Sequence, residues 1–247
     1  MTTTVVDATV LMPACDHSAM NLNRSQPVSV WPDGCIFPVC AGKPETDGEP
    51  WQTQAVVGTA FAVGDRVVTC WHILKGAAEA GLEVGLTFPD GGIRRFVPVA
   101  FERSSDGHDL AIGELPWTPE PQFSLSGDLH EGLDVYSYGY PLTQISQDLD
   151  GERTFKLGLK LFKGYVVSAT ALEFPGYPVA SGLELDMPAP GGMSGAPLLR
   201  DTPGSGGTRD VVGVIQGTRR VDVDGSEDVR LALAYGVDPI AALITNG

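Results

Sequence analysis

Short apolar runs separated by turn residues dominate this sequence. Along each run apolar and polar residues tend to alternate, which is typical of strands that bury one face, and glycine, proline or acidic residues separate the runs. The runs cover residues 56–63, 66–70, 109–115, 133–140, 163–174, 183–187, 195–199, 210–217 and 230–238. Gly64 and Asp65 join the first two runs as a short loop, which predicts a tight β-hairpin there.

Few segments depart from the strand pattern. A helical turn is expected at residues 72–80, and a terminal helix at 238–244, where Asp238 can cap the helix and Pro239 suits its first position. Many short strands with so little helix predict an all-β fold, a barrel or a sandwich. Residues 1–26 have weak periodicity and are interpreted as an N-terminal arm or an edge strand.

Charge argues against two classes of partner. Sixteen Lys and Arg face 31 Asp and Glu, giving a net charge of −15, and no segment gathers the basic residues into a stripe. Binding to nucleic acid or to an anionic membrane would therefore be opposed electrostatically. The N-terminus lacks a basic region followed by a long apolar run, and no stretch is long enough to span a bilayer, so a cytoplasmic location is expected.

Metal and disulfide chemistry are weakly supported. The cysteines are Cys15, Cys35, Cys40 and Cys70, too few for a disulfide scaffold and compatible with a reducing compartment. Residues 15–17 (Cys-Asp-His) with Cys35 and Cys40 could be taken as zinc ligands, but the paired C-x-x-C spacing is missing. The acidic stretch 221–229 lacks EF-hand spacing and is interpreted as a solvated hairpin end. We therefore expect no metal and no cofactor.

The stretch PAPGGMSGAPLL, residues 188–199, sets one serine among three glycines and three prolines. Glycines let backbone N–H groups approach a ligand and prolines stiffen the loop, which suits a reactive hydroxyl as well as an ordinary tight turn. Ser194 would need a histidine as general base. All the histidines precede it, which excludes the α/β-hydrolase order, in which the histidine comes last; they are His17, His72, His108 and His130.

His72 and Asp109 are the candidate partners of this serine. His72 follows the β-branched run RVVTC, so we expect its ring to project from a rigid strand end. Asp109 begins an apolar run, where a buried carboxylate would need a donor such as an imidazole N–H, and neighbouring His108 would point the other way. Taken singly, a core histidine and a plain strand-start aspartate would be the simpler interpretations.

Together these motifs resemble the trypsin-like (chymotrypsin-fold) serine peptidases, especially the compact bacterial branch that includes the Deg and high-temperature-requirement proteases. GTAFAVGDRVVTCWHIL, DLAI and GMSGAPLL are similar to the segments that carry the family's histidine, aspartate and serine, in the same order along the chain. The resemblance spans roughly residues 28–245. It implies two antiparallel β-barrels in one peptidase domain at 27–247, divided near residues 125 and 126, with the active cleft between the barrels.

The resemblance also implies a mechanism and a set of site residues. His72 would be the general base, Asp109 would orient it, and Ser194 would attack a peptide bond, with the N–H groups of Gly192 and Ser194 stabilising the oxyanion. The sequence departs from the family at Cys70-Trp71 before the histidine and at Ala196 after the serine, and neither change removes a reacting atom.

Substrate contacts are predicted on two segments near the serine. VVGVIQG is similar to the strand that pairs with extended substrate, which assigns Ile215, Gln216, Gly217 and Thr218 to substrate binding. Asp186 and Pro188 would form the floor of the specificity pocket. Pro188 stands where enzymes that select Lys or Arg carry a buried acid, so a preference for small or apolar side chains is expected, with an acidic preference through Arg219 and Arg220 as the alternative.

Two other functions remain open at the level of sequence. The chain could be a catalytically idle barrel that binds peptides by strand addition along residues 215–218. It could instead be a cysteine hydrolase that uses Cys70 with His108 or His130. Under the peptidase interpretation the partners are a protein or peptide substrate and a regulatory partner or attached domain, as in the protease component of a bacterial signalling or defence system.

Overall fold

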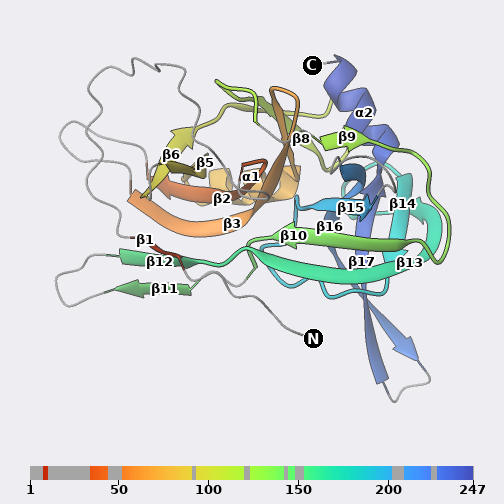
Figure 1. The fold of residues 1–247 in the computed structure, drawn as a ribbon. Helices are drawn as coiled ribbons and strands as arrows, with labels where there is room; N and C mark the ends of the chain where they lie inside the picture. Colours follow the sequence, from red (N-terminus) through yellow and green to blue (C-terminus); the bar gives the residue numbers. More distant parts are fainter. Residues whose placement is uncertain are drawn as a thin grey trace.

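The structure is a computed structural model, and it describes residues 8–10, 34–43, 52–90, 93–119, 123–141, 144–147, 153–201, 209–223 and 227–246. Its strands are β1 (Ala8–Val10), β2 (Ile36–Lys43), β3 (Gln52–Val63), β4 (Arg66–Thr69), β5 (Glu83–Asp90), β6 (Ile93–Pro98), β7 (Phe101–Arg103), β8 (Ala111–Glu114), β9 (Phe123–Leu125), β10 (Asp134–Gly139), β11 (Gln144–Gln147), β12 (Arg153–Leu157), β13 (Lys160–Leu172), β14 (Ala180–Leu185), β15 (Pro197–Asp201), β16 (Arg209–Val223) and β17 (Glu227–Gly236). The helices are α1 (Trp71–Glu79) and α2 (Val237–Asn246). Figure 1 shows two β units side by side, which confirms the predicted all-β class and two-barrel architecture.

The N-terminal unit is a curled antiparallel sheet in the order β6-β5-β2-β3-β4-β8-β7. Its edge strands β6 and β7 do not pair with each other in the described chain, so this unit of the two-barrel fold is a half-barrel. The predicted hairpin is confirmed, because Val63 faces Arg66 across Gly64, whose φ of 65° is favoured by glycine.

The C-terminal unit is a closed barrel. Its strands run β15-β10-β13-β14-β17-β16, and a further pairing of β15 with β16 closes the ring. Its interior is a cluster of apolar side chains from these strands, including Val135, Leu198 and Val212. β9 pairs in parallel with β16, so residues 123–125 belong to this sheet although they precede the boundary expected near residue 125.

A small separate sheet lies beside the two units. It has the order β1-β12-β11, and Ala8–Val10 forms its edge opposite residues 155–157 (Figure 1). The N-terminal segment predicted as an arm or edge strand is described here only at Ala8–Val10. Cys15 and His17, which the zinc interpretation needs, lie outside the described residues.

The two helices lie where the sequence placed helical segments. α1 follows β4 directly and buries Ile73, Leu74 and Ala77. α2 begins one residue before the predicted cap at Asp238, and it buries Ile240 and Leu243 in a core that is shared by both units. None of the described helices has the length and apolar character needed to cross a membrane.

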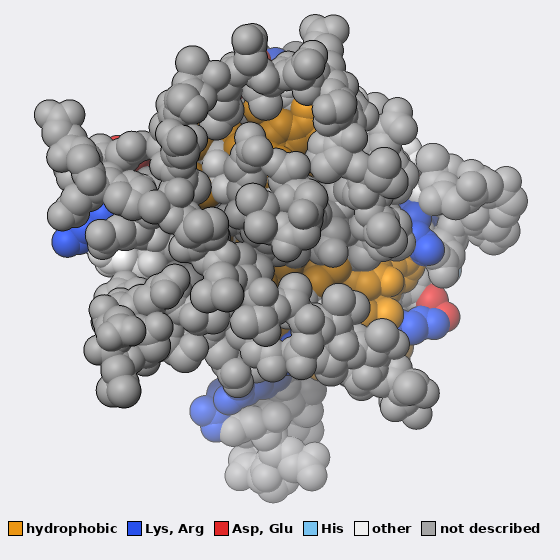
Figure 2. Space-filling model, turned by 60° about the vertical axis from the view of Figure 1, so that its left-hand side comes forward, with side chains coloured by type: hydrophobic (Ala, Val, Ile, Leu, Met, Phe, Trp, Pro, Cys, Tyr) orange, Lys and Arg blue, Asp and Glu red, His pale blue; other side chains and the backbone are white. Residues whose placement is uncertain are grey.

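The outer face of β13 carries large apolar side chains. Leu161, Tyr165 and Val167 alternate along this strand and are 53%, 45% and 37% exposed. On the face drawn in Figure 2, hydrophobic side chains are visible in separate patches, with Lys and Arg side chains near them. The described part of this face therefore carries both apolar and basic side chains, despite the strongly acidic composition of the whole chain.

Candidate active site

The loop between β14 and β15 carries Ser194. Gly192 and Gly195 on either side of the serine have φ values of 96° and 84°, a backbone conformation that side chains other than glycine rarely adopt. Two hydrogen bonds fold the loop into tight turns, from Met193 N–H to Pro190 C=O at 3.0 Å and from Ala196 N–H to Met193 C=O at 2.9 Å. The glycines around the serine therefore set the path of the backbone.

His72 lies in the first turn of α1 and not at a strand end as predicted. Cys70 is still extended (φ −84°, ψ 139°), and the helix begins at Trp71. The backbone N–H of His72, one of the N–H groups that a helix start leaves without a helical partner, donates to Asp109 Oδ1 at 2.7 Å. The Asp109 carboxylate therefore satisfies the helix N-terminus as well as the histidine ring.

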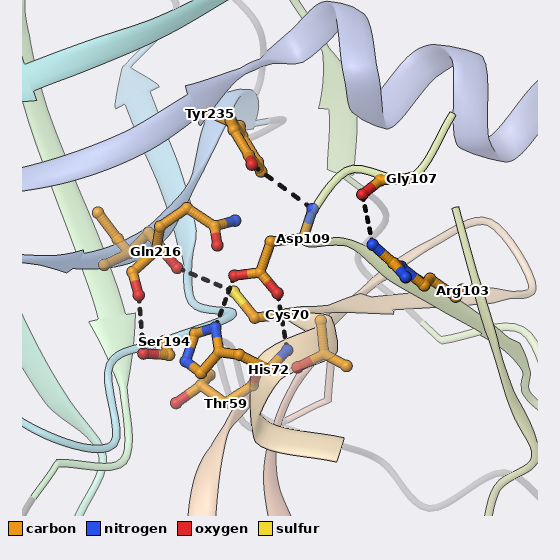
Figure 3. A network of polar contacts seen from close by, with 11 residues as sticks. Thr59, Cys70, His72, Arg103, Gly107, Asp109, Ser194, Gln216 and Tyr235 are labelled. Atoms are coloured by element: carbon orange, nitrogen blue, oxygen red, sulfur yellow. Dashed lines mark hydrogen bonds and ion pairs between the residues drawn. The ribbon is translucent and has the colours of Figure 1, made fainter. Parts of the chain in front are cut away.

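Asp109 is 3% exposed and lies in the segment just before β8. Its Oδ2 is 2.6 Å from His72 Nδ1 (Figure 3). The hydroxyl of Tyr177 also interacts with this carboxyl group: burial, and then the charge and hydrogen bonding of Asp109, raise the pKa of Tyr177 to about 12. Several donors thus compensate for the cost of burying a carboxylate, and this pairing with His72 was expected from the sequence.

Ser194 lies close to this pair. The N–H of Gly195 donates to Ile215 C=O at 2.8 Å, and the thiol of Cys70, two residues before His72, donates to the same carbonyl at 3.3 Å. Ser194 Oγ donates to Gln216 C=O at 3.0 Å. In Figure 3 the side chain of Ser194 lies beside the edge of the His72 ring that faces away from Asp109. The three residues predicted from separate motifs are thus brought together.

Gln216 shapes the site through a β-bulge. The register of β16 with β17 shifts between Ile215 and Gly217, so Gln216 is the extra residue of the bulge. Its backbone carbonyl is the one that accepts the Ser194 hydroxyl, whereas its side chain is 4% exposed and its amide has no hydrogen-bond partner within the described chain. Alternating strand patterns do not indicate a bulge, so this feature was not predicted.

The N–H groups of Gly192 and Ser194 are the predicted oxyanion donors. In the part of the chain that the structure describes, neither of them takes part in a hydrogen bond. By contrast, the carbonyl groups of the same two residues are engaged, with the side chain and the backbone of Thr59 respectively. Both N–H groups are therefore left available to an oxygen atom placed next to Ser194 Oγ.

Cys70 is close enough to His72 and Asp109 for a metal ion to be considered. One ligand atom from each of the three lies within 4.8 Å of the others, a combination that suits zinc. These atoms are already bonded, since Nδ1 contacts Asp109 and the thiol donates to Ile215. Burial, and then the charge of Asp109, raise the pKa of Cys70 well above its usual value, so the thiol is a poor nucleophile.

The predicted substrate-binding residues differ in accessibility. Ile215 is fully buried, and its N–H donates to Ala196 C=O while its C=O accepts Gly195 N–H. Gly217 is half-buried and Thr218 is exposed, so they form the accessible part of this segment. On the pocket side, Asp186 and Pro188 are both exposed. Tyr165 donates to Asp186, and this hydrogen bond raises the pKa of Tyr165.

The chain is similar in sequence and in fold to known peptidases. Residues 58–214 match the sequence profile of the trypsin-like peptidase domain. The Rv3671c protease of M. tuberculosis in its active form is 19% identical with a TM-score of 0.59, and the alignment covers 86% of this chain and 80% of that one.

Two further solved structures are similar in fold. The MamO protease domain of Magnetospirillum magneticum is 17% identical with a TM-score of 0.56, covering 85% of this chain and 95% of that one. The HtrA-type protease AlgWS227A with a tripeptide is 14% identical with a TM-score of 0.57, covering 87% of this chain and 60% of that one. A search of curated proteins finds no match to this chain.

Proposed function

The chain belongs to the trypsin-like peptidase family, a family of serine proteases, and we propose that it is a serine endopeptidase acting through an acyl-enzyme. The observation that carries the proposal is the 2.6 Å contact between His72 Nδ1 and Asp109 Oδ2, next to the loop that presents Ser194. Because Asp109 occupies Nδ1, the second ring nitrogen is left to accept a proton.

In the proposed reaction His72 Nε2 takes the Ser194 proton while Oγ bonds to the substrate carbonyl carbon. The carbonyl electrons move to the oxygen, which the N–H groups of Gly192 and Ser194 would stabilise. His72 then gives the proton to the leaving amine, and the carbon–nitrogen bond breaks. Water hydrolyses the resulting ester by the same proton transfers in reverse.

The Ser194 hydroxyl must leave Gln216 C=O before it can transfer its proton. Rotation about the Cα–Cβ bond of Ser194 is enough to redirect the hydroxyl, because the loop backbone is fixed on both sides of the residue. Catalytic hydrogen bonds in proteins without substrate are often absent or long and form only in the complex. The bond of 3.0 Å to Gln216 is therefore compatible with activity.

A fluorophosphonate probe tests this proposal against the two alternatives. In the expected reaction Ser194 Oγ bonds to phosphorus, fluoride leaves, and peptide mapping finds the adduct on Ser194. No adduct would favour the idle barrel that binds peptides by strand addition. That alternative uses residues 215–218. Ile215 is already bonded to Gly195 and Ala196, whereas Gly217 and Thr218 pair with β17 and lie beyond Val214, where the pairing of β16 with β15 ends. Inactivation by iodoacetamide would favour Cys70 as nucleophile.

Cleavage is expected after small or apolar residues. No acid occupies the position of Pro188, and the exposed Asp186 already interacts with Tyr165. The alternative preference, for acidic substrate residues, relied partly on Arg219, and this side chain already forms an ion pair with Glu184. A cleavage profile on a peptide library measures this preference, and efficient cleavage after Lys or Arg would overturn the prediction.

We also expect activity without removal of an N-terminal segment. In digestive zymogens a new N-terminal amine pairs with an aspartate just before the serine, but here that position is Met193, which is 1% exposed and packs in the interior of the closed barrel. A buried ammonium there would have no counter-charge. Turnover of a fluorogenic peptide by protein carrying an uncleavable tag before Met1 checks this, and activity that appears only after proteolysis would contradict it.

The proposal extends, on the resemblance to bacterial proteases, to the protease component of a signalling or defence system. The cytoplasmic location expected from the N-terminal sequence stays a prediction. Because no zymogen switch is expected, control would come from loop order, a regulatory partner or an attached domain.

A further inference from the structure

We propose that Thr59 is the positioning residue that orients both oxyanion donors, an inference that rests on the proposed peptidase function. Thr59 lies on β3 in the N-terminal unit and is fully buried. All of its polar groups are bonded: its N–H donates to Ser194 C=O at 2.9 Å, its C=O accepts the Thr69 hydroxyl at 2.8 Å, and its own hydroxyl donates to Gly192 C=O at 2.8 Å while accepting Tyr140 N–H at 3.0 Å.

These contacts fix two peptide groups of the serine loop from one side. The C=O groups of Gly192 and Ser194 are both directed at Thr59. Peptide groups are planar and trans, so holding a C=O also holds the following N–H. The Ser194 N–H belongs to the peptide between these two held groups, and the Gly192 N–H belongs to the peptide just before them. The N–H groups that Thr59 holds directly are those of Met193 and Gly195. The two donors lie in the adjoining peptides, so Thr59 restricts their directions through the neighbouring Cα atoms.

The peptide group between Gly192 and Met193 is held by two hydrogen bonds, the one from the Thr59 hydroxyl to Gly192 C=O and the one from Met193 N–H to Pro190 C=O. Gly192 has a φ of 96° and no side chain that could restrain it, so the loss of one of these bonds weakens the restraint on its backbone. A buried hydrogen bond in a region of low dielectric opposes rotation of that backbone. The bond from Thr59 to Gly192 thus restrains the backbone at a residue that has no side chain of its own to pack.

Uncharged residues hold this loop in place, at the position where digestive proteases form an ion pair with a new N-terminal amine. Met193 cannot form an ion pair, and its sulfur lies next to Gly139 on β10. A Cβ atom at Gly139 would be 2.7 Å from that sulfur and 3.0 Å from the Thr59 hydroxyl, so the glycine leaves room for both groups. Thr59, Met193 and Gly139 therefore fit together at the junction of the loop with both units.

The test compares Thr59→Val, which keeps the shape and removes the hydroxyl, with Thr59→Ser, which keeps the hydroxyl. We expect Thr59→Val to lower kcat at least about tenfold with KM within about twofold, because the oxyanion forms only in the transition state. The rate of fluorophosphonate labelling should fall by a similar factor, since the adduct also places an oxygen near these donors. Thr59→Ser should recover most of both rates.

Thr69→Val is the matched control. Thr69 is equally buried and also loses one hydroxyl bond to a carbonyl, but that bond ends on Thr59 and not on the serine loop. Because Thr59→Val also leaves the buried Tyr140 N–H without its acceptor, we expect a smaller loss of stability in Thr69→Val, with a much smaller loss of kcat. Equal losses of kcat in Thr59→Val and Thr69→Val, or no loss in Thr59→Val, would overturn the assignment.

Hydrogen exchange separates this inference from the peptidase proposal. The amides of residues 191–196 should exchange faster in Thr59→Val than in either the wild type or Thr69→Val, whether or not the protein is active. If the wild type fails to react with the fluorophosphonate, the peptidase proposal fails while exchange still decides the role of Thr59. Unchanged exchange in Thr59→Val would overturn that role.

Discussion

Ser194→Ala and His72→Ala are each expected to reduce peptide hydrolysis by roughly four to six orders of magnitude, because members of a triad act as a unit and removing one disables the others. Asp109→Asn should cost somewhat less, since the nucleophile and base remain although the ring loses its negatively charged partner. Initial rates of hydrolysis of a fluorogenic peptide, measured at saturating peptide and equal enzyme concentrations, give these losses.

Matched substitutions away from the site separate catalysis from folding. Ser105→Ala changes an exposed turn serine and His130→Ala changes an exposed histidine, so both should retain wild-type rates. Ser194→Ala and His72→Ala should unfold close to the wild-type midpoint. Wild-type hydrolysis by Ser194→Ala, with contaminating protease excluded, would contradict the assignment of the nucleophile.

Gly195→Ala is expected to lower the free energy of unfolding by about 2–5 kcal/mol and to abolish activity. The added Cβ would lie 2.0 Å from Thr59 C=O and 2.5 Å from the Thr69 hydroxyl, and the residue has a φ of 84°. Both the overlap with backbone and the unfavourable conformation act in the folded state. Urea denaturation with a spectroscopic readout measures the change.

Gly191→Ala in the same loop is the control for Gly195→Ala. Its φ is not positive, and an added Cβ would meet nothing within 4 Å. We expect its unfolding free energy to lie within about 0.5 kcal/mol of the wild type. If Gly195→Ala unfolds at the same urea concentration as Gly191→Ala, then the close packing of the serine loop on β3 has been misjudged.

The strand pattern and the glycine loop were predictable because their signals are local. The hairpin at Gly64 follows from a turn residue between two alternating runs, and the helix at 72–80 from a short amphipathic segment. The pairing of His72 with Asp109 was predicted from chain order and from the cost of burying a carboxylate. The hairpin and the helix needed only neighbouring residues, whereas the pairing of His72 with Asp109 also needed the family resemblance, because each residue taken singly had a simpler interpretation.

The remaining features depend on contacts between distant segments. His72 was expected at a strand end, but its N–H can be satisfied by Asp109, which lets α1 begin at Trp71. Thr59 was part of the quoted Gly-Thr-Ala-Phe motif, yet its bonds reach residues more than 80 positions away. Tyr177 lies in the β13–β14 connection, and the sequence offers no signal that its hydroxyl meets Asp109.

The most direct test of the central claim, that His72 activates Ser194 as a nucleophile, is the rate at which Ser194 is acylated by an activated ester. Rapid-quench mass spectrometry of the intact protein, followed by peptide mapping, measures the acyl adduct in the wild type, His72→Ala and Ser194→Ala. The account predicts a rapid burst on Ser194 in the wild type, acylation slower by at least about a thousandfold in His72→Ala, and no adduct at position 194 in Ser194→Ala. Acylation of His72→Ala at the wild-type rate, or a wild-type adduct on any residue other than Ser194, would contradict it.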